Sequence, residues 1–190
     1  MAHEDLSDLN RLWQNQPAEK APLTLEDIRN RASRLEKRVG RRNLLEYAGA
    51  LFVIVTTSVR LWHETNLVMV IGGALLLVGT LYVVYHLHRW GSARSMPADA
   101  ALMDCLSFHR AELVRQRDLL RGVWWWYLLP FVPGSALLII GRAIERPDRR
   151  LLALGVTAAF VVTFTLVGKL NEYGARKLQR AIDALDKARQ

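Results

Sequence analysis

Four apolar segments constrain this chain more than any other feature of its sequence. They cover residues 43–59, 67–87, 123–141 and 151–168, and each is close to the roughly 20 residues that a helix needs to cross about 30 Å of hydrocarbon. The second contains no Asp, Glu, Lys or Arg, whereas a helix of a soluble protein would show a polar stripe there. The sequence therefore predicts an all-α membrane protein with four transmembrane helices embedded in a lipid bilayer.

The basic residues predict how these helices cross the membrane. Residues 1–42, 88–122 and 169–190 together hold 21 Lys or Arg, and the two remaining connections hold five. Since basic residues accumulate on the cytoplasmic side of membrane proteins, we expect both termini and the middle segment in the cytoplasm. The four arginines between residues 142 and 150 oppose this rule. The net charge of +8 suits an anionic lipid surface, and we expect no nucleic acid as a partner.

The chain divides into five segments by this reasoning. Residues 1–42 form a cytoplasmic N-terminal helical segment, 43–87 hold transmembrane helices 1 and 2, 88–122 form a cytoplasmic amphipathic helix, 123–168 hold transmembrane helices 3 and 4, and 169–190 form a cytoplasmic C-terminal helix.

The N-terminal segment contains the clearest helix start. Thr24 followed by Asp27 resembles a capping box, and the helix that begins there is expected to continue through Gly40 into the first span. Its apolar residues recur at spacings of three and four, as in a coiled-coil-like seam of two heptads. These residues are Leu25, Ile28, Ala32, Leu35 and Val39.

The other two cytoplasmic segments carry similar stripes. The middle helix places Leu102, Leu106, His109, Leu113, Gln116 and Leu120 on one face, and the C-terminal helix does the same with Leu170, Leu178, Ile182 and Leu185. None of these helices could bury its stripe alone. We therefore expect them to pack together as a small cytoplasmic bundle.

Aromatic residues mark the ends of the spans. Tryptophan favours the headgroup depth of a bilayer, which predicts membrane-interface positions for Trp62, Trp90, Trp124, Trp125 and Trp126. The last three follow the middle helix directly. One continuous helix is therefore expected to run from the cytoplasmic segment into the third span.

Proline and glycine predict local features within the spans. Pro130 and Pro133 each remove a backbone donor, so the third span must kink or locally unwind, either as a structural feature or as a hinge. Small residues permit close contact between helices in a membrane. They are Gly72, Gly73 and Gly79 in the second span, and Gly155 with Ala159 in the fourth.

The residues offer little chemistry. Cys105, His109 and Glu112 share a helix face, but three ligands on one straight helix rarely converge on one ion, so no metal site is expected. No phosphate-binding Gly-rich loop, HExxH pair or nucleophile elbow occurs in the sequence. No charged residue lies deep in a span, as an ion pathway would require. We expect no enzyme and no cofactor.

Four stretches of the sequence carry a resemblance. NRLWQNQ, LEDIRNRASRLEKRVGRRNLLEYAGA, CLSFHRAELVRQRDLLRGVWWWYLLPFVPG and KLQRAIDALD are similar to a group of uncharacterised bacterial four-span inner-membrane proteins encoded next to extracytoplasmic-function sigma factors. The resemblance implies a bacterial inner-membrane location and a membrane-bound regulator of a sigma factor. The chain lacks the His-x3-Cys-x2-Cys pattern of zinc-binding anti-sigma domains, which argues against the usual form of sigma-factor capture.

Two functions follow as hypotheses. In the first, the protein is non-enzymatic and its cytoplasmic helices bind a cytoplasmic partner, with a sigma factor as the candidate. The residues predicted to bind that partner are Leu6, Leu9, Trp13, Leu35, Leu106, Leu113 and Arg117. In the second, the protein is a structural membrane module that forms a homo-oligomer and has no role in transcription.

Overall fold

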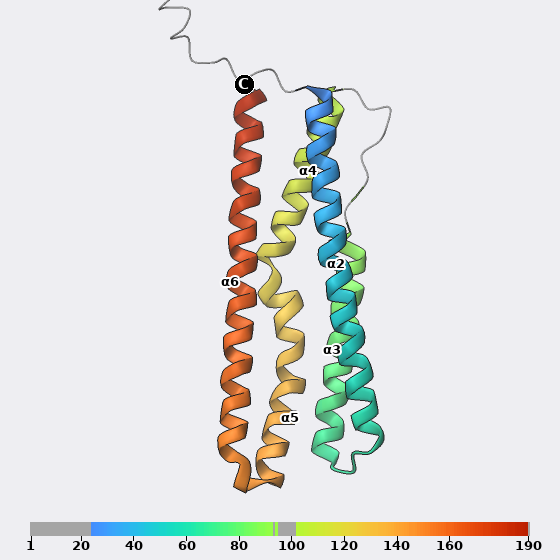
Figure 1. Ribbon diagram of the computed structural model, residues 1–190, viewed down its shortest axis with the longest axis vertical. Helices are drawn as coiled ribbons and strands as arrows, with labels where there is room; N and C mark the ends of the chain where they lie inside the picture. The colour runs from blue at the N-terminus through green and yellow to red at the C-terminus, as the bar shows by residue number, and fades with distance from the viewer. Residues whose placement is uncertain (1–23, 93, 95–101, 190) are drawn as a thin grey trace, which may run out of the picture.

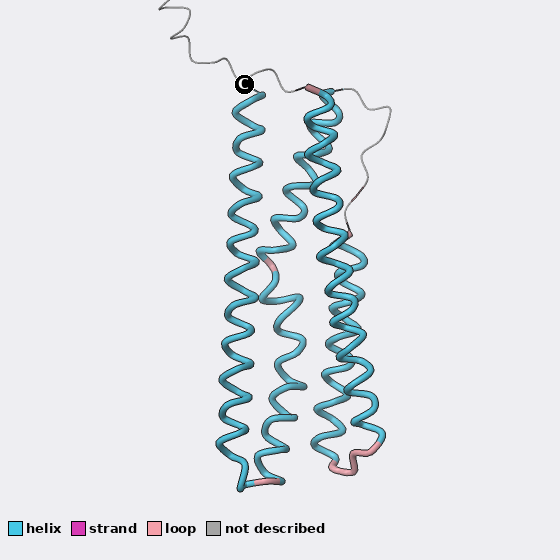
Figure 2. Tube along the Cα trace, in the orientation of Figure 1, coloured by secondary structure: helices cyan, strands magenta, loops and turns pink. Residues whose placement is uncertain are grey.

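The computed structural model describes residues 24–92, 94 and 102–189, and within them every regular element is a helix (Figures 1 and 2). Four of the helical stretches are long and apolar enough to cross a membrane, which confirms the predicted fold class. In chain order the elements are α2 (Leu25–Trp62), α3 (Leu67–Gly91), α4 (Leu102–Arg121), the π-helix η1 (Trp124–Leu128), the 3-10 helix η2 (Leu129–Phe131), α5 (Val132–Glu145), the 3-10 helix η3 (Pro147–Arg149) and α6 (Arg150–Arg189).

The molecule has an apolar half and a charged half. The α2–α3 and α5–α6 hairpins lie at one end, while the start of α2 and the end of α6 lie at the other (Figure 1). Large apolar side chains face outward in the apolar half; Phe52 is 69% exposed and Leu151 is 85% exposed. Lipid tails are as apolar as these side chains, so this surface is suited to a bilayer and not to water.

Helix α2 begins at the predicted capping box. The Asp27 backbone N–H donates to Thr24 Oγ1 at 3.1 Å, and Asp27 Oδ2 accepts from the Thr24 hydroxyl at 2.8 Å and from its backbone N–H at 3.4 Å. The Thr24 hydroxyl holds the pKa of the Asp27 carboxyl below its usual value. From this cap α2 continues through Gly40 to Trp62, as the sequence predicted.

The path from α4 to α5 differs from the expected continuous helix. Helix α4 ends at Arg121, and the wide turn of η1 and the tight turn of η2 come before α5, where the backbone changes direction (Figures 1 and 2). The expected continuity of one helix into the third span is therefore interrupted, and the predicted local unwinding at Pro130 is observed. The cause is the missing N–H of Pro130, which prevents regular α-helical bonding one turn earlier. The Trp126 indole N–H donates to the Leu119 carbonyl at 2.9 Å in this region.

Glycines bring three of the spans into close contact. A Cβ atom built on Gly79 would lie 2.5 Å from the Pro130 carbonyl oxygen, and one built on Gly134 would lie 2.6 Å from the backbone nitrogen of Leu76. The α3 backbone therefore touches η2 at Gly79 and α5 at Gly134. Gly73 gives α2 the same access to α3, because its Cβ would lie 2.6 Å from the Leu61 side chain.

The corresponding expectation for the fourth span is not met within this chain. A Cβ atom built on Gly155 meets nothing within 4 Å, and Ala159 is exposed. The membrane half of α6 packs only loosely against the rest of the chain. Small residues permit close contact, but a facing helix has to be present for that contact to form.

The two kinds of glycine allow a matched test. In Gly79→Ala the added methyl group meets a backbone carbonyl that cannot move alone, so we expect the free energy of unfolding to fall by about 1–3 kcal/mol. In Gly155→Ala the methyl group enters open space, and the higher helix propensity of alanine should leave the stability equal or slightly increased. Thermal unfolding in detergent measures both changes. Equal melting temperatures for the two variants would contradict the close contact between α3 and η2 at Gly79.

Candidate functional site in the charged half

Three helices meet in what we call the charged bundle, formed by residues 25–42 of α2, 102–121 of α4 and 169–189 of α6. Leu113 of α4 and Ile182 and Leu185 of α6 form its buried centre. Half-buried apolar side chains from all three helices surround this centre, namely Leu35, Leu106, Val114 and Leu178. The predicted packing of the stripes into a small bundle is thus observed.

One residue of the predicted α6 stripe does not belong to it. Leu170 is 67% exposed, whereas Ala175, one and a half turns further along, is buried at 2% exposure. The spacing of apolar residues predicts a stripe that includes Leu170, but spacing alone cannot show where α6 first meets α4. The contact begins near Gly174, where an added Cβ would lie 3.2 Å from the Leu120 side chain.

Polar contacts fix α4 against α6 along the outside of the core. The Arg110 guanidinium forms a bidentate ion pair with the Asp186 carboxylate, with N–O distances of 2.7 and 2.9 Å. Two turns closer to the spans, Arg117 donates to Gln179 Oε1 at 2.7 Å. Asp186 raises the pKa of Arg110 through its hydrogen bond and its charge. Exposed pairs of this kind add little stability, so they set the register of the two helices more than they hold them together.

The residues predicted to bind a partner are distributed differently from the expectation. Leu113 is only 4% exposed, and Leu35 and Leu106 pack against it, so all three are covered by their own chain. Arg117 is held by Gln179 and Asp118. The remaining three, Leu6, Leu9 and Trp13, lie outside the described residues.

A cluster of polar side chains connects the charged bundle to the spans, and we call it the polar junction. It consists of Arg42 and Asn43 of α2, Glu112, Arg115 and Gln116 of α4, and the last carbonyl groups of α3. Asn43, Glu112 and Gln116 are 6%, 7% and 1% exposed. Buried polar groups are costly unless they are hydrogen bonded, and here they bond one another.

Arg115 is the most connected member of this cluster. Its guanidinium pairs with Glu112 at 2.6 and 3.0 Å and donates to the carbonyls of Trp90, at 3.0 Å, and Ser92. Asn43 Nδ2 donates to the Gly91 carbonyl at 3.0 Å. The end of a helix has carbonyl groups without partners in the helix and carries partial negative charge. In α3 these carbonyls are satisfied by donors from α2 and α4.

Gln116 completes the cluster from α4. Its Nε2 donates to Glu112 at 3.2 Å, and its Oε1 accepts from Arg42 at 3.3 Å. Sequence reasoning placed Gln116 on the apolar stripe but did not identify the junction. Glu112, Arg115 and Gln116 do have the spacing of helix neighbours, but Asn43 and Gly91 lie far from them in the sequence. The one signal that the sequence offered for this junction was Asn43, a polar residue at the end of an apolar segment.

Below the junction, aromatic residues line the start of the third span. The Tyr127 hydroxyl donates to Glu46 Oε2, which joins η1 to α2. The Trp126 ring stacks on His86 of α3, with ring centroids 4.6 Å apart. These contacts place η1 between α2 and α3, so the irregular turns pack against both of their neighbours.

The five tryptophans predicted at the membrane interface have different surroundings. Trp62 is 87% exposed at the end of α2, Trp90 is exposed at the end of α3, and Trp125 is 75% exposed. Trp124 donates to Glu172 at 3.1 Å and covers Gly168 of α6. Trp126 is half-buried against His86. Three of them therefore face the surroundings, while Trp124 and Trp126 also make contacts between helices.

Cys105 and His109 lie in the bundle beside the junction. Both are buried, at 0% and 5% exposure, and Glu112 is engaged by Arg115 and Gln116. Among the described residues, no three His, Cys, Asp or Glu side chains are placed to hold a metal ion. Burial lowers the pKa of His109, the charge of Arg31 lowers it further, and Glu112 opposes both effects. Within the described part of the chain, His109 Nδ1 has no hydrogen-bond partner.

No protein-family model, curated protein or solved structure matches this sequence. The arrangement of the residues is therefore the basis for proposing a function. The polar groups of the junction form hydrogen bonds with one another, so its role is structural. It fixes how α2, α3 and α4 sit where the charged bundle meets the spans.

The central role of Arg115 can be tested by substitution. Arg115→Gln leaves the buried Glu112 carboxylate without its cation and two carbonyls without donors, so we expect the free energy of unfolding to fall by about 1–3 kcal/mol. Arg121→Gln removes an exposed arginine from the same helix and is the control. The readouts are thermal unfolding in detergent and hydrogen exchange of residues 88–92. If both variants behave like the unchanged protein, Arg115 does not hold the end of α3.

His109 predicts acid sensitivity. Its pKa in the folded protein is lowered, so below a pH of about 6.5 the unfolded chain binds a proton that the folded chain does not. Stability should be constant above about pH 7 and fall as the pH drops toward 5, by at most about 1.4 kcal/mol per pH unit. His109→Leu should flatten the dependence, whereas substitution of the exposed His88 by Gln should not. An unchanged profile in His109→Leu would show that other groups cause the sensitivity.

Proposed function

We propose that this protein is a non-enzymatic, multi-pass protein of a bacterial inner membrane whose charged bundle binds an acidic cytoplasmic protein, and that this partner is a sigma factor. The sigma factor is suggested by the sequence resemblance. The acidic character of the partner is suggested by the surface of the bundle.

The observation that carries the proposal is a basic stripe on α2. Arg34, Arg38 and Arg41 are exposed and follow one another at spacings of four and three, so they share a helix face. That face points away from the side of α2 that buries Ile28 and Val39. A row of cations on a rigid helix favours a partner with a complementary row of carboxylates, and it steers their encounter.

The burial of the leucines changes how such a partner would bind. Leu113 is buried and Leu35 and Leu106 are half-buried in their own bundle, so the exposed basic surface makes the contact in this conformation. Leu6, Leu9 and Trp13 remain predicted apolar contacts. Binding that depends on exposed charges weakens with salt, since the Debye length falls from about 10 Å at 0.1 M to about 3 Å at 1 M.

The proposed topology has both termini in the cytoplasm. Its support is the excess of basic residues in the three segments near the charged half, together with the common end at which α2 starts and α6 finishes (Figure 1). A reporter fused after Gln190 that is active only in the cytoplasm is the expected result. Activity only in the periplasm would reverse the assignment.

The alternative, a structural module that forms a homo-oligomer, has less support. A second copy would be needed if the apolar stripes of the bundle were open. Each of the three helices contributes apolar side chains to a core within one chain. The stripes therefore give no reason for a second copy.

Copurification tests the proposal. Cells expressing the full chain and an extracytoplasmic-function sigma factor of the same bacterium are crosslinked mildly, solubilised in detergent and purified through the membrane protein. We expect the sigma factor to be recovered with the unchanged chain, and the recovery to fall at least about ten-fold in Arg34→Glu/Arg38→Glu/Arg41→Glu, because three positive charges on the contact face become negative.

The control makes the same charge change elsewhere on the bundle. Arg176→Glu/Lys177→Glu/Arg180→Glu alters exposed residues of α6 and should retain the partner. Equal loss in both triple variants would mean that net charge, and not the α2 face, attracts the partner. No specific cytoplasmic protein on the unchanged chain would refute the proposal.

A further inference from the structure

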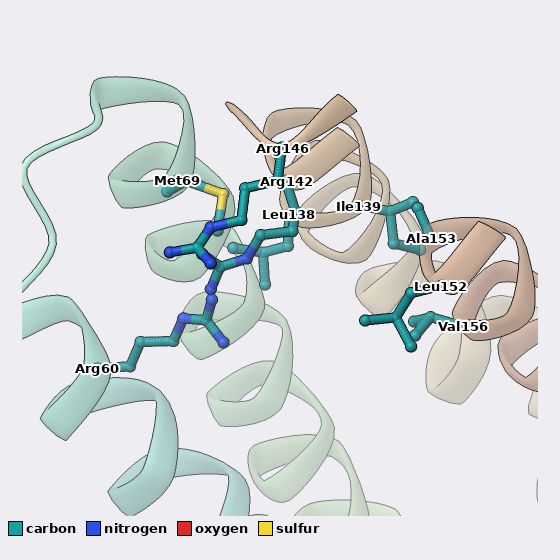
Figure 3. Close-up of a pocket in the computed structure, with 9 residues that line it drawn as sticks. All are labelled: Arg60, Met69, Leu138, Ile139, Arg142, Arg146, Leu152, Ala153 and Val156. Atoms are coloured by element: carbon teal, nitrogen blue, oxygen red, sulfur yellow. The ribbon is translucent and has the colours of Figure 1, made fainter. Parts of the chain in front are cut away.

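A pocket of about 500 Å³ opens between the spans at the end of the molecule opposite the charged bundle (Figure 3). Its lining has two distinct sides. On one side Arg60, from the last turn of α2, and Arg142 and Arg146, from the end of α5, extend their guanidinium groups past Met69. On the other side lie apolar side chains of α5 and α6, namely Ile139, Leu152, Ala153 and Val156.

Among the described residues that line this pocket, three are arginines and none is a carboxylate, while Glu64 lines the adjoining pocket. Arg142 pairs with Glu145 at 3.5 Å, a long contact between partly exposed groups. In the part of the chain that the structure describes, the guanidinium groups of Arg60 and Arg146 take part in no ion pair or hydrogen bond. Like charges that point into one pocket repel each other. An anion between them would remove that repulsion.

Helix dipoles explain only part of this arrangement. Arg60 and Arg142 lie in last turns, where a cation is favoured by the partial negative charge of the helix end. That interaction favours a cation near each helix end, but it does not explain why side chains from two separate helices converge. Their convergence beside an apolar wall fits a ligand that has an anionic group and a hydrocarbon part.

The position in the membrane narrows the choice of ligand. The pocket lies at the hairpin ends of four spans, which is the depth of lipid headgroups on that side. A second pocket of about 240 Å³ adjoins it, because Arg60, Met69 and Leu138 line both. Pockets of about 300–1,000 Å³ are typical of specific small-molecule sites.

We propose that this pocket binds an anionic phospholipid. The lipid phosphate lies among Arg60, Arg142 and Arg146, where guanidinium groups can form paired hydrogen bonds to its oxygens. An acyl chain lies along Leu152 and Val156. The proposal is independent of the cytoplasmic partner, since the pocket and the charged bundle lie at opposite ends of the molecule (Figures 1 and 3).

The test compares three added compounds with the purified full chain in a neutral detergent. Short-chain phosphatidylglycerol, short-chain phosphatidylcholine and inorganic phosphate are each titrated, and apparent affinities are taken from the shift in thermal unfolding. We expect phosphatidylglycerol to bind at least about ten-fold more tightly than either of the others. The zwitterionic lipid lacks the net charge, and free phosphate lacks the hydrocarbon contact.

Variants locate the site. Arg60→Gln/Arg142→Gln/Arg146→Gln should weaken phosphatidylglycerol binding on the order of a hundred-fold, and the corresponding triple lysine variant should recover only part of the affinity, because it keeps the charge but loses the paired hydrogen bonds. Glu145→Gln should strengthen binding a few-fold by releasing Arg142. The matched control, Arg176→Gln/Lys177→Gln/Arg180→Gln at the other end of the molecule, should change the affinity less than two-fold.

Three results would overturn the proposal. Equal affinity for the two lipids would show that charge recognition is absent. Inorganic phosphate binding as tightly as phosphatidylglycerol would assign the arginines to a free anion. An equal loss of affinity in the control variant would show that the lipid responds to net charge alone. Each variant is compared with its own melting temperature without added lipid, so a loss of folding is not mistaken for a loss of binding.

Discussion

The structure depends on satisfying backbone polar groups where helices leave the membrane. Helix α3 ends at this boundary with Gly91 buried, so its last carbonyls need donors from other parts of the chain. Asn43 and Arg115 supply those donors from two other helices, and Glu112 holds the Arg115 guanidinium in place. One requirement of the α3 backbone therefore fixes the positions of α2 and α4, and the charged bundle is built on them.

The helices that cross this boundary divide into two types. Helices α2 and α6 continue from the spans into the bundle, so a rotation of either helix in the membrane rotates its charged half as well. The α4–α5 path is interrupted by η1 and η2 at that level. It is also the path with the most aromatic contacts at the boundary, through Trp124, Trp126 and Tyr127. The protein thus combines two long continuous helices, α2 and α6, with one irregular connection between α4 and α5.

The features that the sequence predicted well are local ones. The Thr24–Asp27 cap, the continuity of α2 and the break near Pro130 depend on residues a few positions apart, whose backbone chemistry is the same in any fold. The length and uniform apolarity of the second span likewise needed no tertiary information.

Other features depend on distant parts of the chain meeting, and these were missed or misplaced. Leu35 and Leu113 belong to the apolar stripes of two different helices. Such a stripe has the same periodicity whether it binds a partner or packs within its own bundle, so periodicity could not distinguish these two cases. Asn43 resembled any polar residue at a span end until the Gly91 carbonyl was beside it. Gly79 and Gly155 are equally small, yet only Gly79 has a backbone facing it. Sequence pattern gives the capacity for a contact, while the fold supplies the partner.

The arginines of the last hairpin show why a charge count and a structure answer different questions. Counting residues 142 to 150 against the rest of the chain makes their arginines an exception to a rule about which side of the membrane is basic. That rule concerns insertion, where every cation near a span has a similar effect. In the folded protein Arg142 and Arg146 share a pocket with Arg60 from a different hairpin, and their cumulative charge acts at one location. Concentrated charge can be retained for binding even where it opposes the insertion preference, since the remaining basic segments outweigh it. Positive charge near lipid therefore favours one topology when it is summed over whole segments. The same charge favours the binding of an anion when it is concentrated at one point.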